Sequence, residues 1–199
     1  WKMNNEDVFT ENSETYMKDH DDFTGDRGND LLLPADPNFT PEVLSDAMVF
    51  SPDSYSIAQN AWQGYETVKI DLWLYHSGDI LSDQTLITAG GASGWAYELR
   101  LRRSSGNRLY FYAIDASGNI QNLNPIIDVN VWNHVVASVD ADTGEMSLTI
   151  TPLGGSPATQ SNPGFGNLLD VNGDIWLGCT RNPGSRPLNA VVDDVKVSL

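Results

Sequence analysis

The segment Thr67–Tyr75, TVKIDLWLY, alternates strictly between aliphatic residues and other residue types. Its aliphatic positions are Val68, Ile70, Leu72 and Leu74. The positions between and beside them are Thr67, Lys69, Asp71, Trp73 and Tyr75. Because successive side chains of a β-strand point to opposite faces, this period of two predicts a strand with one face buried in a core.

Segments with the same alternation follow along the chain to its end. They are Tyr97–Arg102, Leu109–Ala113, Val135–Val139, Met146–Ile150, Ile175–Leu177 and Val191–Leu199. Clusters of Gly, Asn, Asp, Ser and Pro separate many of them, and these residue types favour turns. No window carries apolar residues at helical spacing. Many strands divided by turns predict an all-β chain, folded as an antiparallel β-sandwich or jelly roll.

Charge restricts the partners of the chain. The 199 residues include 27 acidic and 11 basic ones, which gives a formal net charge of −16. Binding to nucleic-acid phosphates depends on Lys and Arg, so we expect no nucleic-acid partner. No apolar run approaches the roughly 18 residues of a membrane span, and we expect a soluble protein without membrane insertion. With one cysteine, Cys179, the chain cannot form an intramolecular disulfide.

The length fits one domain. A chain of this mass can bury roughly 70% of its extended surface, and β-sandwiches of this size are commonly undivided. The first 46 residues carry 12 acids and 3 bases, a net charge of −9. We therefore expect a single domain over residues 1–199, with an acidic, loop-rich N-terminal segment (about 5–46) packed onto it. A solvated tail is the alternative for this segment.

Several stretches resemble, in order, the motifs of laminin-G-like domains. They are Asp22–Leu31, Thr67–Leu74, Trp132–Val136, Ile175–Gly178 and Ala190–Val197. The resemblance extends over essentially the whole chain, although the segment Glu6–His20 has no counterpart in the family pattern. It implies the concanavalin A-like jelly roll of the lectin-glucanase superfamily, in the form found in bacterial carbohydrate-binding modules.

A calcium site is predicted from oxygen-bearing residues. Ca²⁺ prefers carboxylate and carbonyl oxygens, often in a glycine-bent loop. Such a loop is offered by Asp22, Asp26, Asn29 and Asp30. By phase, Asp193 shares the inward face with Val191, Val195 and Val197, and a buried carboxylate needs a partner or a metal. The resemblance places Asp193 and Asp194 beside the loop, where many family members hold a structural Ca²⁺.

Other interpretations of these acidic residues stay open. Asp193 can instead cap backbone amides, with the N-terminal acids simply solvated. Residues 140–145 and 170–174 look superficially like calcium loops, but both fit hairpin turns better.

Catalytic motifs are absent from the sequence. Hydrolases of this fold set two carboxylates close together along one strand. Here Asp71 has Lys69 and Trp73 as its same-face neighbours, and Glu98 stands beside Arg100. The lyases use a Gln-x-His strand, which the chain lacks, and no histidine has a nucleophile companion. We expect a protein that is not an enzyme and has no catalytic residues.

A binding surface is predicted from aromatic and basic residues. Trp95 follows a glycine-rich stretch and can serve as a platform for a sugar ring or as a hydrophobic lid. Arginines cluster beside it, and guanidinium groups bind carboxylate and sulfate in bidentate fashion. The predicted carbohydrate-binding residues are Trp95, Tyr97, Arg100, Arg102, Arg108, Tyr110 and Tyr112. The alternative is that the arginines neutralise the acidic N-terminal segment. We interpret Trp73, Trp132 and Trp176 as structural.

These features together favour a non-catalytic carbohydrate-binding domain with a structural Ca²⁺. Its ligand would be a polysaccharide or oligosaccharide, with an anionic polysaccharide among the candidates. We expect it to be secreted or at the cell surface, within a larger secreted multidomain protein. Two alternatives stay open: a protein- or matrix-binding adhesion module of the same fold, and a polysaccharide lyase or glycoside hydrolase with an atypical site.

Overall fold

The computed structural model of the chain describes residues 8–11, 14–17, 31–32, 39–40, 47–50, 55–78, 80, 82–91, 94–103, 106–180 and 185–199; for those before residue 47 it describes the backbone only. Strands dominate this part of the chain, and no α-helix occurs in it. The strands are β1 (Val8–Glu11), β2 (Glu14–Met17), β3 (Leu31–Leu32), β4 (Phe39–Thr40), β5 (Ala47–Phe50), β6 (Ser56–Gln63), β7 (Val68–Tyr75), β8 (Gln84–Gly91), β9 (Gly94–Leu101), β10 (Leu109–Ile114), β11 (Ile120–Leu123), β12 (Trp132–Asp140), β13 (Glu145–Pro152), β14 (Ala158–Asn162), β15 (Asn172–Leu177) and β16 (Ala190–Ser198). Accordingly, the described residues include no helix that could span a membrane.

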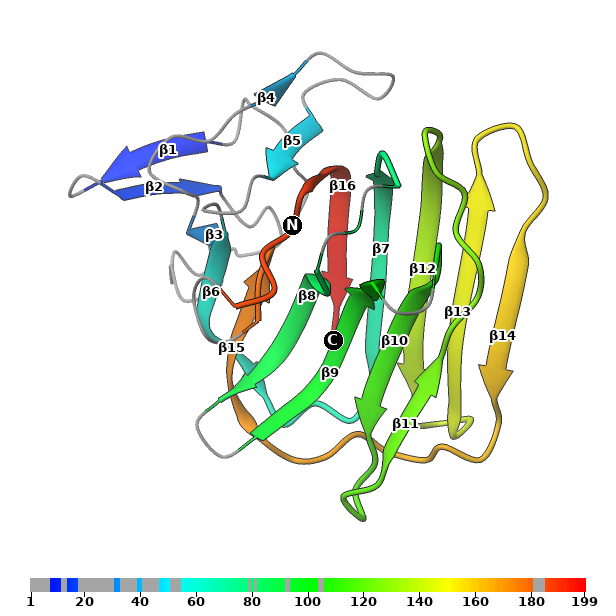
Figure 1. Cartoon of the computed structure of the whole chain (residues 1–199). Coiled ribbons are helices and arrows are strands. Elements are labelled where there is room, and N and C mark those ends of the chain that lie inside the picture. Colours follow the sequence, from blue (N-terminus) through cyan, green and yellow to red (C-terminus); the bar gives the residue numbers. More distant parts are fainter. Residues whose placement is uncertain are drawn as a thin grey trace.

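Two antiparallel sheets form a sandwich, as the sequence predicts. Sheet A has the order β1-β2-β3-β6-β15-β8-β9-β10-β11, and sheet B has the order β14-β13-β12-β7-β16-β5-β4. Figure 1 shows β8, β9 and β10 in one layer, facing β7, β12 and β13 in the other. In each sheet a late strand is central: β15 lies between β6 and β8, and β16 lies between β7 and β5.

The core lies between the sheets and follows the period of two. On β7, Val68, Ile70, Leu72 and Leu74 are fully buried, while the residues between them are half-buried or exposed. The facing strands contribute Leu99 and Leu101 from β9 and Phe111 from β10. Burying a side chain of this kind stabilises the fold by about 2 kcal/mol. The predicted all-β sandwich and the predicted inward face of Thr67–Tyr75 are therefore confirmed.

Parts of the acidic N-terminal segment pair with both sheets. In sheet A, β1 pairs with β2, β2 with β3, and β3 with β6 through Leu32 and Ile57. In sheet B, β4 pairs with β5. These strands continue the sheets of the sandwich, and the rest of the segment lies outside the described residues.

A β-bulge in β16 corrects the predicted phase of its acidic pair. The register with β7 shifts between Asp193 and Lys196, and Asp194 adopts a φ of 47°. Before the bulge it is Val192, not Val191, that is fully buried. Asp193 pairs with Trp73 on the outer face of sheet B, so the prediction that it shares the inward face with Val191 is wrong. Its predicted burial is nevertheless found, because the side chain is 2% exposed.

The two calcium-like stretches differ in structure. Residues 140–145 form the hairpin between β12 and β13, in which Asp140 accepts a hydrogen bond from the backbone N–H of Asp142. Residues 172–174 belong to β15 instead, so the hairpin prediction for 170–174 is wrong. There, Asp174 accepts a hydrogen bond from the backbone N–H of Asn60 across the β6–β15 pair.

A buried histidine follows β7. His76 is 3% exposed, and its Nδ1 accepts a hydrogen bond of 3.1 Å from the backbone N–H of Gly78. Its Nε2 has no hydrogen-bond partner among the described residues. Burial lowers the pKa of His76 below the usual 6.5, because the charged ring is poorly solvated there.

This lowered pKa predicts acid destabilisation. The unfolded chain binds a proton at His76 more readily, so stability is fully present above about pH 6.5 and falls as the pH drops towards the folded pKa. In His76→Asn, an amide oxygen can still accept from Gly78, but no charge forms. We expect its melting temperature to fall less than that of the wild type between about pH 7.5 and 5.5. Equal falls in both proteins, measured by circular dichroism, would contradict this role.

Candidate functional site

The outer face of sheet A carries the predicted binding residues. Because Leu99 and Leu101 of β9 face the core, Glu98 and Arg100 point to the opposite face. Two cross-strand rows follow from the register. One row is Thr85, Arg100 and Tyr110, and the other is Trp176, Thr88, Glu98, Tyr112 and Asn122. Strands β15, β8, β9, β10 and β11 therefore build one continuous surface.

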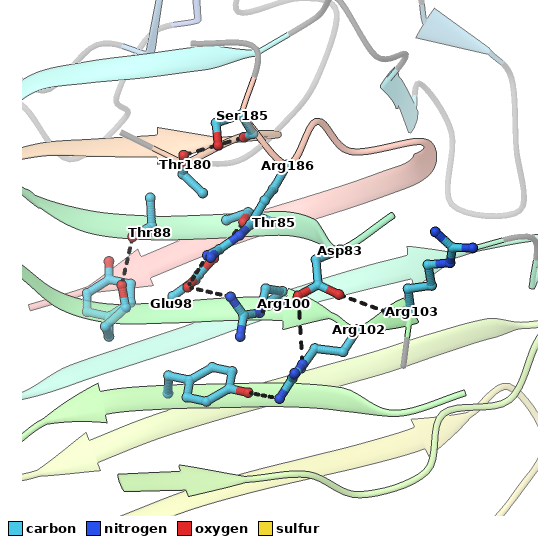
Figure 2. A network of polar contacts seen from close by, with 12 residues as sticks. Asp83, Thr85, Thr88, Glu98, Arg100, Arg102, Arg103, Thr180, Ser185 and Arg186 are labelled. Atoms are coloured by element: carbon cyan, nitrogen blue, oxygen red, sulfur yellow. Dashed lines mark hydrogen bonds and ion pairs between the residues drawn. The ribbon is translucent and has the colours of Figure 1, made fainter. Parts of the chain in front are cut away.

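Glu98 is the central acceptor of this surface and is 6% exposed. Its Oε1 accepts a hydrogen bond of 2.6 Å from the hydroxyl of Thr85. Nη1 of Arg186 donates to Oε1 and Oε2 at 3.1 and 3.2 Å. Figure 2 shows Arg186 reaching Glu98 from the connection between β15 and β16. Both oxygens of the Glu98 carboxylate are thus used in contacts within the protein.

Arg100 lies between two carboxylates. Its Nη1 is 3.5 Å from Oε2 of Glu98, and its Nε is 3.9 Å from Oδ2 of Asp83. The ring of Tyr112 covers one face of the guanidinium, with its centroid 4.5 Å from Cζ. The Arg100 side chain is only 10% exposed. Its charge is therefore held by the ion pairs and by a cation–π contact.

Tyr110 and Tyr112 form a flat aromatic pair on β10. Their rings are stacked at a centroid distance of 5.4 Å and an angle of 12°. The guanidinium of Arg102 lies over the Tyr110 ring at 5.2 Å, and its Nη1 donates a 3.1 Å hydrogen bond to the Tyr112 hydroxyl. This hydrogen bond is the main cause of a raised Arg102 pKa. Tyr110, Tyr112 and Arg102 are half-buried at this surface, and Arg100 is buried beside them.

A bulge turns Trp95 towards the same face. Along β9, Tyr97 pairs with Ala89, but Trp95 pairs with the next residue, Gly90, so that Ala96 is extra. Gly90 has a φ of 151°, and a Cβ there would collide with the Trp95 backbone. Since Ala89 faces the core, its neighbour Gly90 and the paired Trp95 face outward. Trp95 is half-buried at this position.

Tyr97 does not belong to this surface. Its side chain is fully buried on the inner face of β9, where its ring contacts Trp62 at 5.2 Å and Phe111 at 6.5 Å. Burial raises the Tyr97 pKa, as expected for a hydroxyl in the core. The prediction that Tyr97 contacts a ligand is therefore wrong. Strict alternation with Glu98 and Arg100 could have indicated this from the sequence.

Arg108 is only loosely related to the cluster. It shares the outward phase of Tyr110 and Tyr112, but its Nη1 donates to the backbone carbonyl of Asn124 at 2.7 Å. The described contacts thus bring together Arg100, Arg102, Tyr110 and Tyr112, but not Arg108.

Sequence reasoning missed Thr85, Asp83 and Arg186 as members of this network. Asp83 and Arg186 have no motif, and Arg186 lies 88 residues from the carboxylate it binds. Trp176, which the sequence predicts to be structural, packs against Tyr55 at 5.8 Å and lies half-buried on the outer face of sheet A. Its position between the buried residues Ile175 and Leu177 was the available signal.

Comparison with known proteins identifies the family. The family model described as the concanavalin A-like lectin/glucanases superfamily matches residues 52–198. The chain belongs to this superfamily. The laminin-G-like resemblance is thereby confirmed. A search of curated proteins finds no match of significance.

Solved structures of toxin binding domains share this fold. The binding domain of Paraclostridial Mosquitocidal Protein 1 matches with a TM-score of 0.63 and 13% identity, over 96% of this chain and 47% of that one. The botulinum neurotoxin serotype G binding domain matches with a TM-score of 0.59 and 14% identity, over 88% and 44%. The serotype D binding domain matches with 0.58 and 12%, over 84% and 42%. The chain thus spans less than half the length of these structures, and at such identities the likeness concerns the fold.

A second polar cluster lies on the outer face of sheet B. Nε2 of His134 is 2.7 Å from Oδ1 of Asp71, and the His134 ring packs against Trp73 at 5.0 Å. Lys69 is 3.9 Å from the other Asp71 oxygen. In this superfamily member, Asp71 is therefore paired with a histidine and a lysine rather than with a second carboxylate.

The predicted metal ligands are described only in part. Asp22, Asp26, Asn29 and Asp30 lie outside the described residues. Asp193 accepts a hydrogen bond of 2.7 Å from the backbone N–H of Asp194, a contact that fits the amide-capping alternative. Oδ2 of Asp194 binds Lys196 at 2.9 Å, whereas Oδ1 is buried and has no hydrogen-bond partner among the described residues. An unsatisfied carboxylate oxygen is compatible with a cation. No group of three metal-binding side chains is found in the described part of the chain.

The ion-pair network predicts a large effect of Glu98 on stability. Glu98→Ala would leave Arg100 with Asp83 alone and Arg186 without its acceptor. We expect the free energy of unfolding to fall by about 3 kcal/mol, as is usual when one partner of a buried ion pair is removed. Urea unfolding measures it. Exposed Glu66 is the control, and Glu66→Ala should change stability by about 0.5 kcal/mol or less. Equal effects of the two substitutions would contradict the role of Glu98.

Proposed function

We propose that this chain is a non-catalytic carbohydrate-binding domain, and that its ligand is a polysaccharide or oligosaccharide bound on the outer face of sheet A. The stacked pair Tyr110 and Tyr112, bordered by Arg100 and Arg102, is the observation that carries this proposal. Sugar rings have an apolar side that packs on flat aromatic rings, and hydroxyl groups that need polar partners. This surface offers both.

Trp95 and Trp176 extend the aromatic character of the proposed site. Trp95 lies on the outer face beside β8, and Trp176 lies in the same cross-strand row as Tyr112. Neighbouring strands are about 4.8 Å apart, so the row from Trp176 to Tyr112 crosses about 14 Å. A linear chain of several sugar rings can follow a surface of that length. We therefore favour an oligomeric ligand over a single sugar.

The state of the carboxylates supports a binding role over catalysis. A glycosidase needs two carboxyl groups free to act on the substrate. Glu98 is held by Thr85 and Arg186, and Asp83 contacts Arg100 and Arg102. The structural neighbours described above are binding domains as well. A polysaccharide ligand also fits the proposed location, secreted or at the cell surface, as a module of a larger protein.

We also propose a structural Ca²⁺ held by Asp193 and Asp194 together with the loop containing Asp22, Asp26, Asn29 and Asp30. The buried Asp193 carboxylate and the unsatisfied Oδ1 of Asp194 support the proposal. The positive charge of the ion would offset the negative charge of the carboxylates that bind it. Its role would be to fix the N-terminal segment against β16.

The sugar-binding proposal predicts loss of retention when the aromatic surface is truncated. Tyr112→Ala and Trp95→Ala should each weaken retention in affinity gels containing polysaccharide, by about tenfold in Kd, because each removes a stacking platform. Melting temperatures show whether each variant is folded.

Tyr75 is the matched control for these variants. It is a half-buried tyrosine on the outer face of sheet B, where it packs against Trp132 at 5.8 Å. Tyr75→Ala should keep wild-type retention. A wild-type protein retained by no polysaccharide would refute the proposed function. Retention weakened equally by Tyr75→Ala and Tyr112→Ala would place the ligand elsewhere.

The calcium proposal predicts a thermal shift. After treatment with EDTA and removal of the chelator, added Ca²⁺ should raise the melting temperature by several degrees, because it binds the folded chain only. Asp194→Asn should abolish the shift while tolerating the positive φ, which asparagine readily adopts. Asp142→Asn, in the β12–β13 turn, should retain it. A wild-type melting temperature insensitive to Ca²⁺ would refute the site.

A further inference from the structure

Arg100 differs in one respect from Arg102 and Arg186, the other arginines of its ion-pair network. Arg102, Arg108 and Arg186 each donate a hydrogen bond, at 3.1, 2.7 and 3.1 Å. Arg100 is the least exposed arginine of its ion-pair network, yet within the described residues it donates none. Its Nε is buried and has no hydrogen-bond partner there. The Nε of Arg102 is in the same state, but Arg102 donates through Nη1. A buried guanidinium whose N–H groups lack acceptors is costly, so the site favours an incoming acceptor.

The carboxylates near Arg100 offset its positive charge but do not accept hydrogen bonds from its N–H groups. Glu98 and Asp83 approach it at 3.5 and 3.9 Å, whereas a charge-assisted hydrogen bond measures about 2.7–2.9 Å. Glu98 is already bound by Thr85 and Arg186, and Oδ1 of Asp83 accepts from the backbone N–H of Arg103 at 3.0 Å. These commitments hold both carboxylates in place. The unfilled donors of Arg100 therefore remain for a ligand.

The balance of charge defines how much negative charge the ligand can bring. Three guanidinium groups, those of Arg100, Arg102 and Arg186, face the two carboxylates of Glu98 and Asp83. One positive charge is left uncompensated, on a chain whose formal net charge is −16. The site thus attracts one anionic group, while the net negative charge of the protein disfavours polymers that carry more than one charge on each sugar, such as heavily sulfated ones.

The shape of the site favours a planar anion. One face of the Arg100 guanidinium is covered by the Tyr112 ring, so an acceptor must approach in the guanidinium plane. A carboxylate matches that plane with two parallel hydrogen bonds. The stacked Tyr110 and Tyr112 rings alongside can receive the sugar ring that bears it.

We propose that the site recognises the carboxylate of a uronic acid residue within a polysaccharide, and that Arg100 is the residue that selects it. This inference rests on the proposed carbohydrate-binding function. Arg100 binds the carboxylate, and Tyr112 and Tyr110 pack on the sugar ring. Glu98 is a positioning residue: it binds Arg186 and lies beside the guanidinium of Arg100. Each uronic acid residue brings one negative charge, which equals the charge left uncompensated by the site.

The test uses matched ligands with and without the carboxylate. The full chain is titrated with polygalacturonate, alginate and polyglucuronate, each beside its methyl ester, and with dextran sulfate. We expect at least one free polyuronate to bind about ten- to a hundredfold more tightly than its ester, the range of a charge-assisted bidentate contact. Since the bulk charge is repulsive, this binding should not weaken steeply with salt, unlike counterion-driven attraction to a polyanion.

Substitutions then assign the preference to Arg100. Arg100→Gln should remove the difference between acid and ester. Lys69→Gln, which removes the same charge from the outer face of sheet B, should preserve it. Arg102, whose side chain is 35% exposed, provides a second variant that disturbs less of the core. Arg102→Gln removes the uncompensated positive charge of the network and a contact of the tyrosine pair, so it should weaken binding of both acid and ester and narrow the difference between them without removing it. It tests the surface even if Arg100→Gln does not fold.

The outcomes separate this inference from the proposed function. Equal affinity for acid and ester, with retention still lost in Tyr112→Ala, would overturn carboxylate selection and leave sugar binding intact. Dextran sulfate binding as tightly as the best polyuronate and weakening steeply with salt would also overturn it, as would an acid preference that survives in folded Arg100→Gln. Absence of binding to any neutral or acidic polysaccharide would overturn the proposed function itself.

Discussion

The register between β8 and β9 is the constraint on which the surface depends. A strand presents alternate residues to the core, so one extra residue reverses every side chain beyond it. Bulges at two points of this pair, between Thr85 and Ile87 and next to Gly90, allow both strands to keep apolar residues inside while choosing what lies outside. Without the bulge at Ala96, Trp95 would share the inner face with Tyr97. The glycine at position 90 makes that arrangement sterically possible.

The strand pattern could be predicted from the sequence because the core imposes it. Between Val68 and Leu74 aliphatic residues alternate with other types in the sequence, and burial in the structure alternates in the same way. The predicted face is wrong where a bulge intervenes: alternation from Val191 places Asp193 on the inner face, but Asp193 lies opposite Trp73 on the outer face of sheet B. A bulge of this kind is hard to predict from residue types, because it is a local change of backbone conformation. Here it places Asp194 at a φ of 47°.

The candidate site could be predicted only as a cluster. The proximity of Arg100 to Arg102 is local in sequence, and the pairing of β9 with β10 brings Tyr110 and Tyr112 beside them. The ion pairs that hold these arginines are harder to predict. Glu98 was visible as a neighbour of Arg100, but Arg186 approaches it from a distant connection, and no local pattern encodes that contact. The sequence therefore indicates the cluster of arginines, but it does not show how far the carboxylates of Glu98 and Asp83 neutralise their charge.

The position of the last two long strands has a consequence for how the chain acquires its structure. Strand β15 fills the space between β6 and β8, and β16 the space between β5 and β7, so neither sheet is continuous until the C-terminal residues have paired. Contacts so distant in sequence slow folding, because a long loop must close before they stabilise anything. While the chain is being synthesised, β6, β8, β5 and β7 expose unpaired edges, and such edges are prone to aggregation. The strong acidity of the chain, which keeps partly folded molecules apart by mutual repulsion, is well suited to protect it during that interval.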